Sequence, residues 1–216
     1  MDEEKRYVWY ASFGSNLFRD RFRCYIEGGR PSGSNRAEVG SRDCTLPVRD
    51  KPVRLPYSLY FAGWSDRWNG AGAFIDTVRN ENTETWGRMY LITEEQFEDV
   101  VRQENGLHTL NVNLDNVMQS GSDLINEDSY YGNLLYAGES DGYSIFTFTN
   151  AHPQSEQTIT KPSPSYLRML ISGFLEAYTS DVNQIKNYLY PKRGVNDFYT
   201  MQEIEALITE VIEEKA

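Results

Sequence analysis

Glu104 is the carboxylate of this sequence whose position best suits proton transfer. Phe97, Val100 and Val101 recur with the period of an α-helix, and Glu104 follows Phe97 by seven residues, so it extends the same apolar face. The other acidic residues of this segment are expected to point elsewhere: Glu94, Glu95, Glu98 and Asp99. Burial and the last helical turn both favour the neutral acid, which suits a general base that works near neutral pH. The alternative is that the helix end frays and Glu104 turns to water or pairs with an arginine.

A glycine turn after the first apolar segment is the second candidate for chemistry. It consists of Phe13, Gly14, Ser15, Asn16 and Leu17. Because glycine tolerates unusual torsions, consecutive N–H groups can face one concavity and hold a carboxylate or an oxyanion. An ordinary strand-to-helix turn, capped by Ser15 or Asn16, is the alternative. Three arginines follow the turn and either form a solvated helix face or attract an anionic substrate: Arg19, Arg21 and Arg23.

Composition argues against several classes of protein. The 216 residues include 32 acidic and 21 basic side chains, and this net charge of −11 opposes binding to nucleic acid or to an anionic membrane surface. Two cysteines and two histidines, without metal-binding spacing, predict no built-in metal centre. No apolar run approaches the roughly 20 residues that span a bilayer. The charged N-terminus has no stretch of secretory type, so we expect a cytoplasmic protein.

The elements that position these groups are predicted to be strands first and helices last. Strands are expected over 7–13, 57–62, 71–78, 85–92 and 143–149, the middle three as an antiparallel meander or barrel. Thr93 and Gln96 fit a capping box that begins the helix of Glu104, and Gly106 ends it. Further helices are expected after Asn16, from Ser163-Pro164, from Val182 and from Thr200. Residues 27–41 predict a loop, and residues 107–142 show no clear pattern. This order indicates an α+β fold.

Four short segments occur in a characteristic order along the chain. They are Tyr10 to Leu17 around the glycine turn, Trp86 to Ile92, Gln103-Glu104-Asn105-Gly106, and Ser163-Pro164-Ser165-Tyr166-Leu167. Together they resemble the gamma-glutamylcyclotransferase-like family. The first is similar to its Tyr-Gly-Ser-Asn loop and the second to its glycine-containing strand. The third is similar to the Glu-Gly end of its catalytic helix, and the fourth to the Pro-Ser-Pro-x-Tyr opening of its C-terminal helix. The resemblance covers roughly residues 7–178.

The resemblance implies a small mixed β-barrel flanked by helices over residues 1–180. Residues 181–216 would then be a helical C-terminal extension packed on the same domain. It also implies a cofactor-free enzyme of the lyase or acyltransferase class. Such an enzyme converts a small γ-glutamyl amino acid, peptide such as glutathione, or amine to 5-oxoproline and the free amine.

The family's site residues map onto this chain position by position. The backbone of Gly14, Ser15, Asn16 and Leu17 would bind the glutamyl group, and Glu104 would be the general acid/base. Phe13 stands where the family most often has tyrosine. In the strand at 143–149, Phe146 stands in place of a tyrosine that lines the pocket, and Tyr143 is a candidate to compensate for it.

Three alternatives stay open. The same fold can bind a glutamate-like metabolite without turnover, which the substitutions at Phe13 and Phe146 favour. A hydrolase that pairs Glu104 with Asp76 or Glu139 is the weakest reading, because the distance between the carboxylates is undetermined. The apolar face of the last helix serves either to close the fold or to form a homodimer.

Overall fold

The computed structural model describes residues 5–31 and 36–215. The chain divides into two compact units. The first comprises Met1–Ser12, Asp20–Val53 and Met89–Ala151, within the described ranges, and the second comprises Phe13–Arg19, Arg54–Arg88 and His152–Ala216. Glu104 therefore belongs to the first unit and the glycine turn to the second, and each unit is described by itself.

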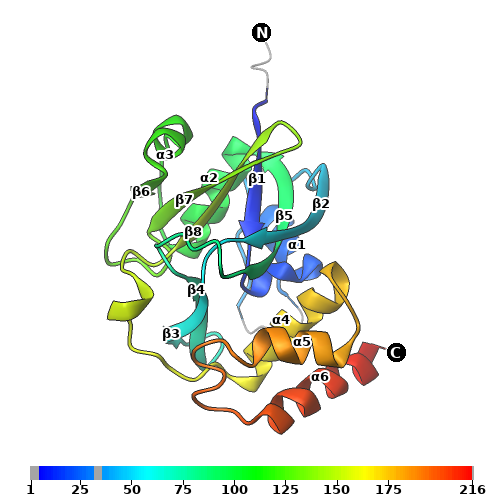
Figure 1. Cartoon of the computed structure of the whole chain (residues 1–216). Coiled ribbons are helices and arrows are strands. Elements are labelled where there is room, and N and C mark those ends of the chain that lie inside the picture. The colour runs from blue at the N-terminus through cyan, green and yellow to red at the C-terminus, as the bar shows by residue number, and fades with distance from the viewer. Residues whose placement is uncertain (1–4, 32–35, 216) are drawn as a thin grey trace. The chain divides into compact units, whose positions relative to one another are not determined.

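A six-stranded mixed sheet has the strand order β2-β5-β1-β8-β7-β6 (Figure 1). Its strands are β1 (Tyr7–Ser12), β2 (Arg49–Leu55), β5 (Thr85–Thr93), β6 (Ser122–Leu124), β7 (Asn133–Ser140) and β8 (Tyr143–Thr149). β1 and β8 run parallel, with Trp9 opposite Ile145 and Tyr10 opposite Phe146. β7 is antiparallel to both β6 and β8. The mixed sheet and its helices confirm the α+β class.

An aromatic core lies on one face of this sheet in the first unit. The helices of the unit are α1 (Arg19–Glu27), α2 (Glu94–Glu104) and α3 (Leu114–Ser120). Phe97 of α2 lies 5.8 Å from Phe146 and 6.0 Å from Tyr10, measured between ring centroids. Phe22 of α1 stacks on Tyr90 of β5 at 4.0 Å. Burying such large side chains fixes α2 against β8, which is the packing that positions the end of α2.

The second unit contains a hairpin and three long helices. Its elements are η1 (Ser15–Leu17), β3 (Leu59–Ser65), β4 (Gly70–Ile75), η2 (Gln154–Glu156), α4 (Pro164–Ala177), α5 (Val182–Leu189) and α6 (Met201–Lys215). β3 and β4 pair antiparallel, with Tyr60 opposite Phe74. α6 packs on both α4 and α5, which lie beside it in Figure 1. Trp86 stacks on Tyr188 of α5 at 4.1 Å, between ring centroids.

Most of the expected elements are present, and the differences come from long-range pairing. β8 occupies the predicted range 143–149, and Ser163 caps α4 by accepting the Tyr166 N–H. The expected three-stranded meander is wrong, because β5 does not join β3 and β4 but lies between β2 and β1. Residues 107–142 contain α3, β6 and β7, and β2 occupies a charged segment that no pattern had indicated. The expected boundary at residue 180 stays a prediction; α5 and α6 are grouped with α4 in one unit.

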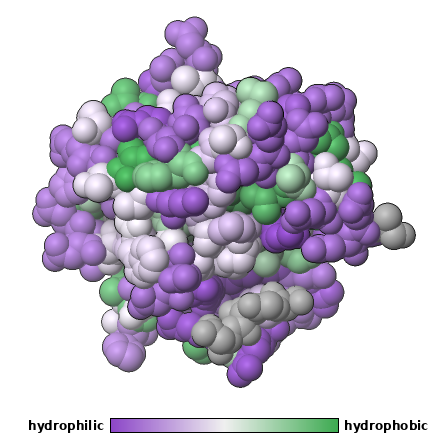
Figure 2. Space-filling view, turned by 90° about the horizontal axis from the view of Figure 1, so that it is seen from below, coloured by the Kyte–Doolittle hydropathy of each residue, from purple (hydrophilic) through white to green (hydrophobic). Residues whose placement is uncertain are grey.

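Polar side chains dominate one visible face of the molecule (Figure 2). The face seen in Figure 2 is mostly hydrophilic, with hydrophobic side chains in separate patches. Within residues 5–31 and 36–215, no helix has the length and apolar character that crossing a membrane requires.

Candidate functional site

Helix α2 begins at a complete capping box. The Thr93 hydroxyl accepts the Gln96 N–H at 3.1 Å, and the Gln96 side chain accepts the Thr93 N–H at 3.0 Å. Two donors that the first turn would leave unpaired are thereby satisfied. Phe97, Val100 and Val101 are fully buried, as the periodicity predicted. The cap and the apolar face together set the register in which α2 presents Glu104.

A polar segment, residues 40–45, runs along α2 and is called the α2 strap here. Its Gly40 N–H donates to the Gln103 side chain at 3.2 Å, near the end of the helix. Its Arg42 binds Asp99 through the backbone N–H at 2.8 Å and the guanidinium at 3.0 Å. Asp99 is fully buried, so the expectation that it points away from the interior is wrong. The Asp99 carboxylate can be buried at low cost, because the α2 strap and Arg102 supply hydrogen-bond donors to it.

The C-terminal end of α2 is held on two sides, with Glu104 between the two anchors. The Gln103 side chain donates to the Tyr25 carbonyl at 3.0 Å. The Asn105 side chain donates to the Val101 carbonyl at 2.9 Å and accepts the Tyr131 N–H at 3.2 Å. These bonds satisfy groups that a helix end leaves open, so the alternative of a frayed end does not apply. Glu104 itself is half-buried.

Two further predicted site residues, Tyr143 and Phe146, lie on opposite faces of β8. Phe146 is buried among Phe97, Tyr10 and Tyr136 on the face that α2 covers. Tyr143 is half-buried on the other face, where its ring lies 5.9 Å from the Arg49 guanidinium. Residues three apart in a strand point in opposite directions. The structure therefore does not bring these two side chains together.

The glycine turn lies in the second unit as a short 3₁₀ helix. The Leu17 N–H donates to the Gly14 carbonyl at 3.0 Å, and the Phe18 N–H donates to the Ser15 carbonyl at 3.2 Å. Phe13, Asn16 and Leu17 are buried, whereas Gly14 and Ser15 are half-buried. In the part of the chain that the structure describes, the Ser15 N–H has no acceptor. Among the N–H groups expected to bind an anion, that of Leu17 already donates to the Gly14 carbonyl and is not available to a ligand.

Helix α4 holds this turn by close contact. A Cβ atom on Gly14 would lie 3.2 Å from the Tyr166 hydroxyl, and one on Gly173 would lie 2.4 Å from the Leu17 Cβ. Gly14 has a φ of −102°, so a side chain there would be crowded by the Tyr166 hydroxyl rather than strained by a left-handed backbone. The Glu176 carboxylate accepts both the Arg19 N–H at 3.1 Å and the buried Arg88 guanidinium at 2.7 Å. The glycine turn and α4, far apart in sequence, thus pack together along the length of the helix.

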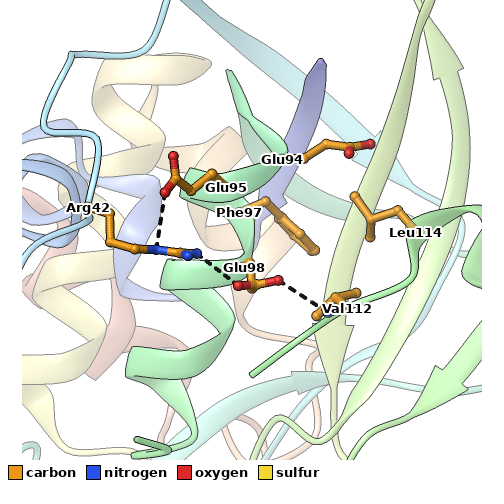
Figure 3. Close-up of a pocket in the computed structure, with 7 residues that line it drawn as sticks. All are labelled: Arg42, Glu94, Glu95, Phe97, Glu98, Val112 and Leu114. Carbon is orange, nitrogen blue, oxygen red and sulfur yellow. Dashed lines mark hydrogen bonds and ion pairs between the residues drawn. The ribbon is translucent and has the colours of Figure 1, made fainter. Parts of the chain in front are cut away.

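A pocket of about 420 Å³ opens at the N-terminal end of α2. Figure 3 shows its lining residues: Arg42, Glu94, Glu95, Phe97, Glu98, Val112 and Leu114. The Arg42 guanidinium contacts Glu95 at 3.3 Å and Glu98 at 2.8 Å, and Glu98 also accepts the Val112 N–H at 3.3 Å. Most of its polar groups therefore already bind one another. Glu104 lies at the opposite end of the helix, about 15 Å along its axis.

The remaining polar candidates are dispersed. The two histidines of the sequence, His108 and His152, are both exposed, and His152 lies 3.7 Å from Glu156. The Asp76 carboxylate accepts the Gln154 N–H at 3.1 Å, as a turn residue does. Over the described ranges, no group of three or more histidine, cysteine, aspartate or glutamate residues is arranged to hold a metal ion.

Solved structures with the same architecture identify the fold. A structure named gamma-glutamyl cyclotransferase covers 95% of this chain and 99% of its own, at 16% identity and a TM-score of 0.52. A crystal structure of an uncharacterized human protein gives the same coverage and TM-score, at 17% identity. The protein is thus an α+β protein with the gamma-glutamyl cyclotransferase fold. The resemblance found in the four sequence segments is confirmed at the level of the fold.

Sequence comparison finds a curated relative whose name does not mention gamma-glutamyl cyclotransferase. The chain is 34% identical over 201 residues to a protein of Arabidopsis thaliana named Histone deacetylase 5. The alignment covers 84% of this chain but 30% of the relative, so the chain spans less than a third of that relative's length. No family model matches the chain.

Sequence reasoning missed the residues that immobilise the candidate site. The contacts of Gln103, Asn105, Arg42 and Arg21 could not be read from the sequence, because each includes a partner 17 or more residues away: Tyr25, Tyr131, Asp99 and Glu38. Arg21 is buried, so the expectation of a solvated arginine face is wrong at this position. One signal was available for Asn105, because an asparagine directly after a helix often caps it.

Proposed function

We propose that this protein is a cofactor-free cyclotransferase that converts a γ-glutamyl amino acid, peptide or amine to 5-oxoproline and the free amine. The observation that carries the proposal is the end of α2, where Gln103 and Asn105 hold the half-buried Glu104 within the gamma-glutamyl cyclotransferase fold. The proposed place of action is the cytoplasm.

Glu104 is assigned the proton transfers. The α-amine of the substrate begins as an ammonium, so Glu104 takes a proton to free the nucleophile. The amine then attacks the γ-carbonyl carbon of the same molecule, a C–N bond closes the five-membered ring, and the bond to the leaving nitrogen breaks. The same carboxyl group returns that proton to the leaving nitrogen as its bond breaks. The ring nitrogen then loses its second proton to the released amine, which leaves as an ammonium. Because nucleophile and electrophile belong to one molecule, positioning supplies much of the acceleration.

The glycine turn is assigned the binding of the glutamyl group. The Ser15 N–H is the donor best suited to this role, because the Leu17 N–H is engaged by the Gly14 carbonyl. Leu17 contributes packing against Gly173 instead. A backbone N–H is a suitable donor because its direction is fixed before the substrate arrives.

The test is product formation by purified protein. Wild type is incubated with γ-glutamyl amino acids, γ-glutamyl amines and glutathione, and 5-oxoproline is measured by mass spectrometry. Glu104→Gln keeps the shape of the side chain but cannot accept a proton, so we expect a rate lower by about 10²-fold or more. Glu95→Gln is the control on the same helix, since its side chain is 49% exposed. Wild-type activity in Glu104→Gln, with folding intact in both variants, would contradict the assignment.

Ligand binding without turnover is the second candidate. Phe146 has no hydroxyl and is 1% exposed among aromatic rings, so it offers a substrate no hydrogen bond. Calorimetry with glutamate-like compounds distinguishes the enzyme from the binding protein. Saturable binding, with no product formed from any substrate, supports a protein that binds its ligand without turnover. Histone deacetylation, the activity in the relative's name, is not proposed for this chain.

A further inference from the structure

Arg88 is the one charged side chain of β5, a strand whose nine residues are all buried. Its side chain is 2% exposed, and its guanidinium donates to the Glu176 carboxylate at 2.7 Å. Glu176 lies in the last turn of α4, where the helix dipole disfavours negative charge. A buried ion pair adds little net stability over apolar side chains of similar size, so packing alone does not account for this one.

The same carboxylate also binds the chain directly after the glycine turn. Its Oε2 atom, which accepts the Arg88 guanidinium, accepts the backbone N–H of Arg19 at 3.1 Å. Arg88, Arg19 and Glu176 all lie in the second unit, together with the turn. One oxygen atom therefore connects a buried cation, the end of the turn and helix α4.

Glu176 gives the turn a direction that close packing alone does not give. A Cβ atom on Gly173 would lie 2.4 Å from the Leu17 Cβ and 3.0 Å from the Phe18 nitrogen, so the turn rests directly on the helix. Contact of this kind sets a distance, but it is not directional. A hydrogen bond to a carboxylate is both strong and directional. The bond to Arg19 therefore restricts rotation of the turn on α4, and with it the direction of the Ser15 N–H.

We propose that Glu176 and Arg88 form a positioning pair that orients the Ser15 N–H toward the glutamyl group of the substrate. This inference rests on the proposed function, in which that N–H binds the substrate. Arg88 keeps the carboxylate in place and the carboxylate holds the chain at Arg19, so the turn is oriented before the substrate arrives. A contact that is equally strong in the ground state and the transition state lowers KM without raising kcat. The pair should therefore act chiefly on KM.

Glu176→Gln tests the pair, because it keeps the size of the side chain and removes its charge. With a γ-glutamyl substrate that wild type converts, KM should rise about tenfold, and kcat should stay within about twofold of wild type. An unchanged KM, or a loss that lies in kcat instead, overturns the inference. Arg168→Met is the matched control and should keep the wild-type KM. Arg168 lies on the same helix, but its ion pairs with Glu210 and Glu214 join α4 to α6 rather than to the turn.

Hydrogen exchange tests the pair without a substrate, so it stays decisive if the proposed reaction fails. The Leu17 and Phe18 N–H groups donate within the turn, whereas the Leu167 N–H donates at the other end of α4. In Glu176→Gln, exchange at Leu17 and Phe18 should accelerate about tenfold, and exchange at Leu167 should not change. Equal acceleration at all three groups, which a purely stabilising ion pair would give, overturns the inference. No acceleration at Leu17 and Phe18 also overturns it.

Glu176→Asp takes the place of Glu176→Gln if the latter does not fold. Aspartate keeps the negative charge that the buried Arg88 requires, but its carboxylate is withdrawn by one methylene group and reaches the Arg19 N–H less well. The same local acceleration at Leu17 and Phe18 is then expected. Its absence in a folded Glu176→Asp overturns the inference.

Discussion

Gly173 shows how single residues set the position of the glycine turn. A Cβ atom at this position would lie 2.4 Å from the Leu17 Cβ and 2.8 Å from the Leu17 carbonyl carbon. Helix α4 and the turn must separate to admit even a methyl group. We therefore expect Gly173→Ala to lower the free energy of unfolding by about 1–3 kcal/mol, measured by urea denaturation.

The neighbouring Ser172→Ala provides the control for Gly173→Ala. Ser172 is half-buried in the same helix, and its replacement removes atoms without adding any. We expect a change within about 0.5 kcal/mol. Equal stability of Gly173→Ala and wild type would show that α4 and the turn are not in the tight contact described.

At the scale of elements, the α2 strap connects both ends of α2 to one segment. Gly40 binds Gln103 near the last turn, and the carbonyls of Asp43 and Thr45 accept from the Gln96 side chain in the first turn. The buried Asp99 lies between these contacts and binds Arg42. Because these contacts hold α2 at both ends and in the middle, the backbone at Glu104 is expected to keep one position.

Asp43 makes this strap sensitive to acid. The Lys5 ammonium and the hydroxyl and N–H of Thr45 lower the pKa of Asp43 from 3.8 to about 2. A group whose pKa is lower in the folded state stabilises the fold above its unfolded pKa, and the contribution is lost as pH falls through the folded value. Between pH 4 and pH 2 (the window of that shift), wild type should therefore lose about 1 kcal/mol that Asp43→Asn lacks.

Denaturant unfolding as a function of pH measures the contribution of Asp43. Asp128→Asn, in an exposed turn, is the control and should keep the acid dependence of wild type. If the difference in unfolding free energy between wild type and Asp43→Asn stays constant between pH 4 and pH 2, the hydrogen bonds from Lys5 and Thr45 do not stabilise the strap.

At the scale of the whole molecule, the charge of −11 determines which partners the surface repels. Binding to nucleic acid gains most of its free energy from basic side chains that release counterions, and this chain has 11 more acidic than basic residues (32 against 21). We expect no retardation of a short DNA duplex in a gel-shift assay at physiological salt. A salt-sensitive complex would reveal a local basic surface strong enough to overcome the net charge.

Local signals in the sequence determined where several elements begin and end. The capping boxes at Thr93 and Thr200 and the serine-proline pair at Ser163 were readable because a cap acts between residues three positions apart. The buried face of α2 could also be predicted, because the helical period of its apolar residues lies within one short stretch of sequence. Four short segments also sufficed to predict the fold, because the residue types that characterise each segment lie within a few positions of one another.

Tertiary structure decided the surroundings of the candidate site. Asp99 and Arg21 are polar residues that a sequence pattern assigns to solvent, yet both are buried, because Arg42 and Glu38, from segments outside their own helices, pair with them. The pairing of β5 with β1 and β2, and the opposite directions of Tyr143 and Phe146, likewise depend on which strands meet. A period reports which face of an element is buried, but only the folded chain supplies the partner that a buried charge requires.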